Sequence, residues 1–302
     1  MSERVAAVDC GTNSIRLLIA DLVDGSLVEV DRRMTIVRLG QGVDATGSFA
    51  PEALQRVFAA ADDFAAVIRA TGAARVRFVA TSAARDVSNR DEFLTGIAAR
   101  FRVEPEIISG REEAELSFRG ATASLDLPAP YLVADIGGGS TELVVGDTDG
   151  VIAAESLNLG SVRLTERQIT ADPTPPDELA AITKDIDALL DTCAVPLTEA
   201  RTLIGVAGTA TTVAAVALGL PEYDRSAVHH ARLGADDLRA TTTWLTNSTR
   251  AERSAVRSIH PGRVDVIGAG ALILQRLFDR LTLNELVVSE HDILDGVALS
   301  LG

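Results

Sequence analysis

The pattern of hydrophobic and polar positions repeats between the two halves of the chain. Residues 5–21 (VAAVDCGTNSIRLLIAD) and 133–147 (VADIGGGSTELVVGD) each contain a hydrophobic run, an aspartate, a glycine-containing polar turn and a second hydrophobic run that ends in aspartate. This pattern predicts two strands joined by a tight turn. The two stretches have identical residues at Asp9/Asp135, Gly11/Gly137, Ser14/Ser140, Leu17/Leu143 and Asp21/Asp147. We therefore expect one structural unit to occur twice.

The rest of the pattern extends this repeat into two α/β halves. The first half predicts strands at 4–10, 15–21 and 26–34, a glycine-rich loop at 38–49, a helix from Pro51 to Gly72, a strand and small-residue loop at 75–85, a helix at 91–100, and a strand at 104–110 followed by a helix. The second half predicts three strands between 131 and 157, helices near 161–169 and 176–193, a strand at 202–208, helices at 209–219 and 268–281, a strand at 285–289 and a last helix from about 292. We expect two domains, residues 1–124 and 125–302.

Composition narrows the class of protein without identifying its chemistry. The net charge of −15 argues against a general binder of nucleic acid or membrane surfaces, but not against a small anionic substrate. No apolar run approaches the ~20 residues of a membrane span, and the N-terminus lacks the layout of a signal peptide. Cys10 and Cys193 have no metal-binding spacing and are expected to be reduced thiols. These features predict a cytoplasmic protein.

The three consecutive glycines at 137–139 need an explanation, because glycine weakens a strand unless something approaches the backbone closely. The N–H groups of such a turn form a concave anion site, and glycine removes the side chains that would block it. The turn around Gly11 is equivalent to it. We expect two similar halves to face each other across a cleft, with phosphate groups bound at both turns.

These stretches resemble the phosphate motifs of the actin-like superfamily of sugar kinases, chaperone ATPases and phosphatases. Together with VRLGQGVDATG, ATSAARD, EIISGREEAEL and IGAGALIL, they resemble the exopolyphosphatase/guanosine pentaphosphate phosphohydrolase family, in order over nearly the whole chain. The resemblance implies two duplicated ribonuclease-H-like (actin-like) domains facing an interdomain cleft, with the last helix, about 292–302, returning to the first domain. Long members of the family have further C-terminal helical domains, so we expect a short, two-domain member.

The segment SGREEAEL, residues 109–116, offers the candidate for acid–base chemistry. Ser109 and Glu112 have the spacing of a capping box, in which the glutamate side chain reaches back to the cap. Glu113 lies about 100° further around the helix and is left to face the cleft. From the residues alone, both acids are equally explained by the favourable field of a helix N-terminus. The resemblance places the catalytic carboxylate at Glu113, as general base for the attacking water, and a guanidinium for the terminal phosphate at Arg85.

Asp135 and Glu142 flank the second turn, seven residues apart, so both side chains could meet at its mouth. Mg²⁺ takes oxygen ligands and commonly bridges carboxylates and phosphates. Asp9 holds the equivalent place in the first turn and is a third candidate for the metal. The alternatives are that Asp9 and Asp135 bind turn N–H groups, and that Glu142 is a solvated strand residue.

Further candidates for phosphate contacts follow the two turns. Arg16 comes just after the first turn, and Gly208 and Thr209 begin a helix whose N-terminus offers an anion site. The expected phosphate-binding residues are Gly11, Thr12, Asn13, Ser14, Arg16, Gly137, Gly138, Gly139, Ser140, Thr141, Gly208 and Thr209.

The resulting hypothesis is a Mg²⁺-dependent exopolyphosphatase that releases terminal orthophosphate from inorganic polyphosphate. Guanosine pentaphosphate is the alternative substrate, because its 5′-terminal phosphate has the same phosphoanhydride. A small-molecule kinase of the same fold, which needs a firm adenosine pocket, and a non-enzymatic filament protein, which needs an added apolar surface, are more remote alternatives. We expect no nucleic-acid or membrane partner, and the resemblance implies a homodimer.

Overall fold

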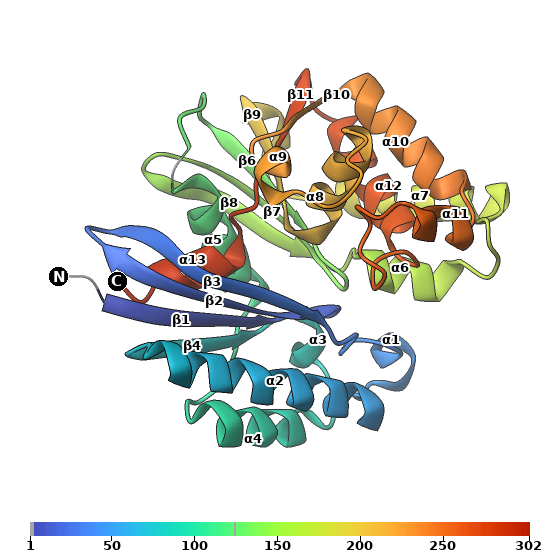
Figure 1. Cartoon of the computed structure of the whole chain (residues 1–302). Helices are drawn as coiled ribbons and strands as arrows, with labels where there is room; N and C mark the ends of the chain where they lie inside the picture. Colours follow the sequence, from blue (N-terminus) through green and yellow to red (C-terminus); the bar gives the residue numbers. More distant parts are fainter. Residues whose placement is uncertain (1–2, 124) are drawn as a thin grey trace. The chain divides into compact units, whose positions relative to one another are not determined.

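The computed structural model describes residues 3–123 and 125–302, which form two units (Figure 1). Unit 1 comprises residues 3–123 and 292–302, and unit 2 comprises residues 125–291. The boundary predicted between residues 124 and 125 involves residue 124, which lies outside the described residues. The last segment, 292–302, falls within the range predicted for the second domain, but its helix is expected to return to the first domain, and it is part of unit 1.

A mixed five-stranded sheet forms the centre of unit 1, in the order β3-β2-β1-β4-β5. The first three strands are antiparallel neighbours, whereas β4 runs parallel to β1 and β5 runs parallel to β4. The strands are β1 Glu3–Cys10, β2 Ser14–Val23, β3 Ser26–Ile36, β4 Arg75–Ala80 and β5 Glu106–Ile107. The strand expected at 104–110 is therefore only two residues long.

Helices cover both faces of this sheet. One face packs against α2 and α4 in a core that includes Ala6 and Val8, and the other packs against α5 and α13 in a core that includes Val5 and Ala7. The run from Val5 to Val8 is apolar at every position because both of its faces are buried. The helices of unit 1 are α1 Val43–Thr46, α2 Pro51–Thr71, α3 Ser82–Arg85, α4 Arg90–Phe101, α5 Gly110–Thr122 and α13 Ile293–Leu299.

The long helix α2 begins and ends where the sequence predicts. Pro51 occupies its first turn, where a missing N–H group costs nothing. Gly72 ends it with a φ of 70°, a left-handed conformation that favours glycine. Two segments expected to be loops contain single-turn helices instead, α1 within 38–49 and α3 directly after β4.

Unit 2 contains a six-stranded sheet in the order β10-β11-β9-β6-β7-β8. Its first three strands in the sequence, β6, β7 and β8, form an antiparallel meander like that of unit 1. Strand β9 runs parallel to β6. The strands are β6 Tyr131–Ile136, β7 Thr141–Asp147, β8 Gly150–Leu157, β9 Thr202–Val206, β10 Arg232–Gly234 and β11 Glu285–Val288. The helices are α6 Ser161–Gln168, α7 Pro176–Asp191, α8 Ala207–Ala217, α9 Arg225–Val228, α10 Ala235–Asn247, α11 Arg250–Ala255 and α12 Ile267–Phe278, with a 3₁₀ turn at Leu197–Glu199.

Residues 220–266 contain four elements that the pattern does not predict, namely α9, β10, α10 and α11. The longest of them, α10, includes four threonines, which have low helix propensity. Leu238, Thr242 and Leu245 of this helix are nevertheless buried in unit 2. Packing against the rest of unit 2 therefore stabilises α10, and a local pattern does not report such packing. None of the described helices is long and apolar enough to cross a membrane.

Candidate active site

The two glycine turns have the same backbone geometry. In unit 1 the N–H group of Gly11 donates to the carbonyl of Ser14 at 2.9 Å, and in unit 2 the N–H group of Gly137 donates to the carbonyl of Ser140 at 3.0 Å. Each bond closes the turn between the first two strands of a meander. The repeat seen in the sequence is therefore a repeat of one hydrogen-bonded turn.

A second glycine packs against each turn, and neither of them is among the predicted site residues. A Cβ atom on Gly160 would overlap the carbonyl group of Gly138, and one on Gly40 would overlap the side chain of Thr12. The N–H group of Gly40 donates to the carbonyl of Thr12 at 2.8 Å, and that of Val162 donates to the carbonyl of Gly138 at 2.9 Å. Both glycines follow a leucine, in RLGQ and NLGS, but the same pair also occurs in ALGL and RLGA, so the local sequence does not single them out.

These contacts partly answer the question raised by the triple glycine. Backbone packs closely against one side of the turn, where the segment after Gly160 binds its carbonyl groups. Within the described part of the chain, the N–H groups of Gly138, Gly139 and Ser140 have no hydrogen-bond acceptor. Adjacent N–H groups of this kind form an anion site. The binding of phosphate by these groups stays a prediction.

Two of the predicted phosphate-binding residues, Thr141 and Thr209, use their hydroxyl groups to bind backbone carbonyl groups. Thr141 donates its hydroxyl to the carbonyl of Leu159 at 2.6 Å, and Thr209 donates its hydroxyl to the carbonyl of Ile136 at 2.9 Å. Both side chains are buried. These hydroxyl groups therefore support the backbone around the second turn and do not present their protons to a ligand.

The start of α8 lies against an arginine, Arg263, that is not among the predicted site residues. A Cβ atom on Gly208 would lie 2.5 Å from the guanidinium carbon of Arg263. Arg263 also donates to the hydroxyl of Thr212, one turn further along α8, at 3.2 Å. The anion site predicted at this helix N-terminus thus includes a cation from a distant segment, which local spacing could not indicate.

Asp135 and Glu142 are directly opposite each other on β6 and β7. Their residues are 6% and 1% exposed, and Glu142 accepts a hydrogen bond from Ser156 at 2.6 Å. Glu142 is therefore not the solvated strand residue of the alternative reading. Like charges opposite each other on neighbouring strands repel, so two buried carboxylates suit a bound cation.

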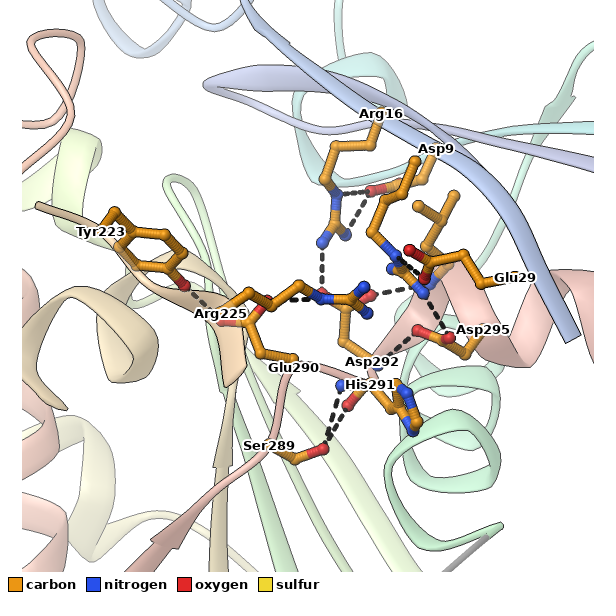
Figure 2. A network of polar contacts seen from close by, with 12 residues as sticks. Asp9, Arg16, Glu29, Tyr223, Arg225, Ser289, Glu290, His291, Asp292 and Asp295 are labelled. Carbon is orange, nitrogen blue, oxygen red and sulfur yellow. Dashed lines mark hydrogen bonds and ion pairs between the residues drawn. The ribbon is translucent and has the colours of Figure 1, made fainter. Parts of the chain in front are cut away.

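Asp9 has the equivalent place in unit 1, but its partner is a cation. Arg16 is its neighbour across β1 and β2 and donates Nε and Nη2 to Oδ2 of Asp9, at 3.0 and 2.6 Å (Figure 2). Oδ1 of Asp9 is buried and has no hydrogen-bond partner among the described residues, so it can accept a bond from a ligand or a hydrated ion. Within residues 3–123 and 125–302, no group of three or more His, Cys, Asp or Glu side chains is placed to hold a metal ion.

Burial and neighbouring charges shift the pKa values of Asp9 and Asp292 in unit 1 in opposite directions. Burial raises the pKa of Asp9 above its ordinary value, and the guanidinium of Arg16 only partly offsets this. Burial also favours the neutral form of Asp292, which accepts a bond from Nη1 of Arg16, but Arg16 and Arg32 hold the pKa of Asp292 below its ordinary value. Arg16 therefore lies between two carboxylates, and its predicted contact with phosphate remains a prediction.

The structure brings Glu113 and Arg85 together. The carboxylate of Glu113 forms an ion pair with Nη2 of Arg85, whose Nε donates to the carbonyl of Ile108 at 3.1 Å. Glu113 is 8% exposed. Among the described residues, Nη1 of Arg85 has no partner, so this guanidinium holds the carboxylate and keeps a donor for a phosphate oxygen.

The neighbouring glutamate does not form the predicted capping box. The hydroxyl of Ser109 does accept the N–H group of Glu112, at 3.1 Å. The carboxylate of Glu112, however, pairs with Arg77 at 2.7 Å and does not return to the cap. Arg77 lies on β4 and also binds Glu106, so it draws Glu112 toward the sheet edge. Glu112 and Glu113 thus point to different arginines.

The chain is similar to known proteins over almost its whole length. The Ppx/GppA phosphatase family matches residues 18–301. Exopolyphosphatase 2 of Mycobacterium tuberculosis is 49% identical over 99% of this chain and 98% of its own length. The crystal structure of the Aquifex aeolicus member of the Ppx/GppA family is 29% identical, with a TM-score of 0.85, and the match covers 100% of this chain and 98% of that chain.

A more distant relative has a different name. The guanosine-5′-triphosphate,3′-diphosphate pyrophosphatase of Vibrio atlanticus is 28% identical over 97% of this chain and 58% of its own length. Together these likenesses confirm the predicted fold class of duplicated, actin-like α/β units.

Proposed function

The chain belongs to the Ppx/GppA phosphatase family, and on this basis we propose that it is an exopolyphosphatase that releases terminal orthophosphate from inorganic polyphosphate. The ion pair of Glu113 with Arg85 carries the proposal, because it joins a buried proton acceptor to a phosphate-binding cation. Full-length similarity to a protein named exopolyphosphatase supports the choice of substrate.

Glu113 acts as the general base. As the oxygen of a water molecule bonds to the terminal phosphorus, one water proton passes to the carboxylate of Glu113. The bond from phosphorus to the bridging oxygen breaks, and its electron pair stays on the shortened polyphosphate. Arg85, with Nε and Nη2 already engaged, stabilises the charge on the terminal phosphate through Nη1.

The glycine turns supply fixed N–H donors for phosphate oxygens, as oriented backbone dipoles that need no reorganisation. We assign Asp135 and Glu142 to Mg²⁺, with Asp9 as the third candidate ligand. A bound Mg²⁺ would neutralise part of the phosphate charge. The paired burial of Asp135 and Glu142 supports their assignment, and the unpartnered Oδ1 of Asp9 leaves an oxygen that can accept a bond from a hydrated ion.

Guanosine pentaphosphate is the second candidate substrate. Its terminal phosphoanhydride requires the same base and the same guanidinium, and the similarity to the Vibrio atlanticus enzyme favours it.

We also propose that the protein is a cytoplasmic homodimer. The net charge of −15 argues against binding to membrane surfaces. The molar mass measured by static light scattering at micromolar concentration tests whether the protein is a dimer.

Orthophosphate release from three substrates tests the function. The purified protein is incubated with Mg²⁺ and polyphosphate, guanosine pentaphosphate or ATP. We expect release from polyphosphate, and release from guanosine pentaphosphate alone would establish the second candidate. No release from either, with ATP consumed in phosphorylating a small molecule or in polymerisation, would overturn the proposal in favour of a kinase or a filament protein.

A further inference from the structure

The residue before the last helix, α13, brings a carboxylate to Arg16 near the start of β2. Asp292 is the N-cap of this helix, and its Oδ1 accepts the N–H group of Leu294 at 2.9 Å. Its own N–H group donates to the carboxylate of Asp295 at 3.0 Å. The remaining oxygen, Oδ2, accepts from Nη1 of Arg16 (Figure 2). One side chain thus serves both the end of α13 and an arginine 276 positions earlier in the sequence.

Direct backbone contact with α5 fixes the position of α13. A Cβ atom on Gly120 would overlap the carbonyl oxygen of Asp292, and one on Gly296 would overlap the carbonyl oxygen of Leu116. The two glycines let the helices approach more closely than any side chain would allow. Because α5 carries Glu113 in its first turn, the same pair of helices sets both Asp292 and the general base.

Arg16 is held from two sides at the beginning of β2. Asp9 binds it through Nε and Nη2, and Asp292 binds it through Nη1. The Arg16 side chain is 17% exposed. A planar guanidinium with carboxylates on two edges keeps one orientation, which a single partner would not enforce.

We propose that Asp292 is a positioning residue that fixes Arg16 beside the first glycine turn, and thereby sets the affinity for the phosphate groups of the substrate. The effect on affinity rests on the proposed function, whereas the effect on Arg16 does not. An arginine that contacts phosphate equally before and during hydrolysis contributes uniform binding. Loss of its position therefore raises KM and leaves kcat nearly unchanged.

The variant Asp292→Asn tests the proposal, because asparagine keeps the size and a capping oxygen but removes the negative charge. We expect the KM for tripolyphosphate to rise at least fivefold and kcat to change less than twofold. The second readout is the ¹⁵N NMR signal of the Nη1–H₂ group of Arg16, the group that donates to Asp292, assigned by its disappearance in Arg16→Lys. We expect its exchange with solvent to become at least tenfold faster in Asp292→Asn.

Asp295→Asn is the matched control on the same helix. Its carboxylate binds Arg32 at 2.5 Å and the N–H group of Asp292, but not Arg16. We expect a lower Tm with unchanged KM and unchanged exchange at Arg16. Equal changes in both variants, or wild-type exchange at Arg16 in Asp292→Asn, would reduce Asp292 to a stabiliser of α13 and overturn the proposal. If the wild-type protein released no orthophosphate, the proposed function would fail, and the exchange measurement would still decide the positioning.

Discussion

The two strand–turn–strand hairpins, β1–β2 and β6–β7, have the same turn and opposite electrostatics. In each, an aspartate is the last residue but one of the first strand and has a charged residue directly opposite on the second. The opposite residue is Arg16 for Asp9 and Glu142 for Asp135. One hairpin therefore contains an ion pair, and the other contains two buried carboxylates.

This difference shows how a duplicated hairpin can divide two tasks. The ion pair in unit 1 offers a guanidinium beside a turn, which suits phosphate oxygens. The two carboxylates in unit 2 repel each other unless a cation lies near them. A site of this kind suits Mg²⁺. A single position, 16 in one copy and 142 in the other, thus determines which charge each turn presents.

Among the changes that test this comparison, Glu142→Arg is expected to affect orthophosphate release most. It gives the hairpin β6–β7 the same aspartate–arginine pair as β1–β2. An arginine at 142 should pair with Asp135 and remove the proposed cation site, so orthophosphate release should fall by about 10³-fold or more. The structure itself should survive, because an ion pair replaces two like charges. Phosphate release and Tm, each measured with and without Mg²⁺, check this.

Mg²⁺ should raise the Tm of the wild-type protein, since a ligand that binds the folded state stabilises it. That rise should be absent in Glu142→Arg. A variant that keeps its activity, or that still gains stability from Mg²⁺, would contradict the assignment of Asp135 and Glu142 to the metal.

A smaller effect is expected from Glu142→Gln, which keeps the shape and the bond from Ser156 but removes one negative charge. The Mg²⁺ concentration for half-maximal activity should rise about tenfold, while activity at saturating Mg²⁺ stays close to wild type. A titration of activity against Mg²⁺ measures this directly. An unchanged half-maximal concentration would remove Glu142 from the metal site.

The smallest effect is expected from Glu112→Gln. Its carboxylate is half-exposed and bound to Arg77, and such pairs contribute about 0–1 kcal/mol to the free energy of unfolding. Phosphate release should stay within about twofold of wild type, and Tm should fall by less than about 3 °C. Loss of activity in this variant would mean that the base is assigned one residue too late along α5.

Much of the fold follows from local pattern. The apolar runs that end in Asp9 and Asp135, the proline and glycine that bound α2, and the serine that caps α5 all act within a few residues, so the sequence reveals them. The helix α10 could not be predicted, because its threonines are stabilised only by burial in unit 2.

The candidate site was predicted less completely. The turn residues and the neighbouring acids Glu112 and Glu113 are visible in sequence, but their partners are not. Arg16 binds Asp292, which is 276 positions away in the sequence, and Arg263 binds Thr212 of α8, which is 51 positions away. Such contacts depend on how distant elements pack. The close packing of Gly40 and Gly160 against the two turns also depends on tertiary structure, because Leu-Gly pairs occur elsewhere in the chain.

The most direct test of the account is the rate of orthophosphate release by Glu113→Gln, measured beside equilibrium binding of polyphosphate. Glutamine keeps the size of the side chain but cannot accept the proton of the attacking water. A positioned base contributes about 10²–10⁴-fold, or roughly 3–5 kcal/mol of barrier. We predict a fall in rate of that size with polyphosphate affinity near that of the wild type. A Glu113→Gln variant that releases orthophosphate at the wild-type rate would contradict the mechanism.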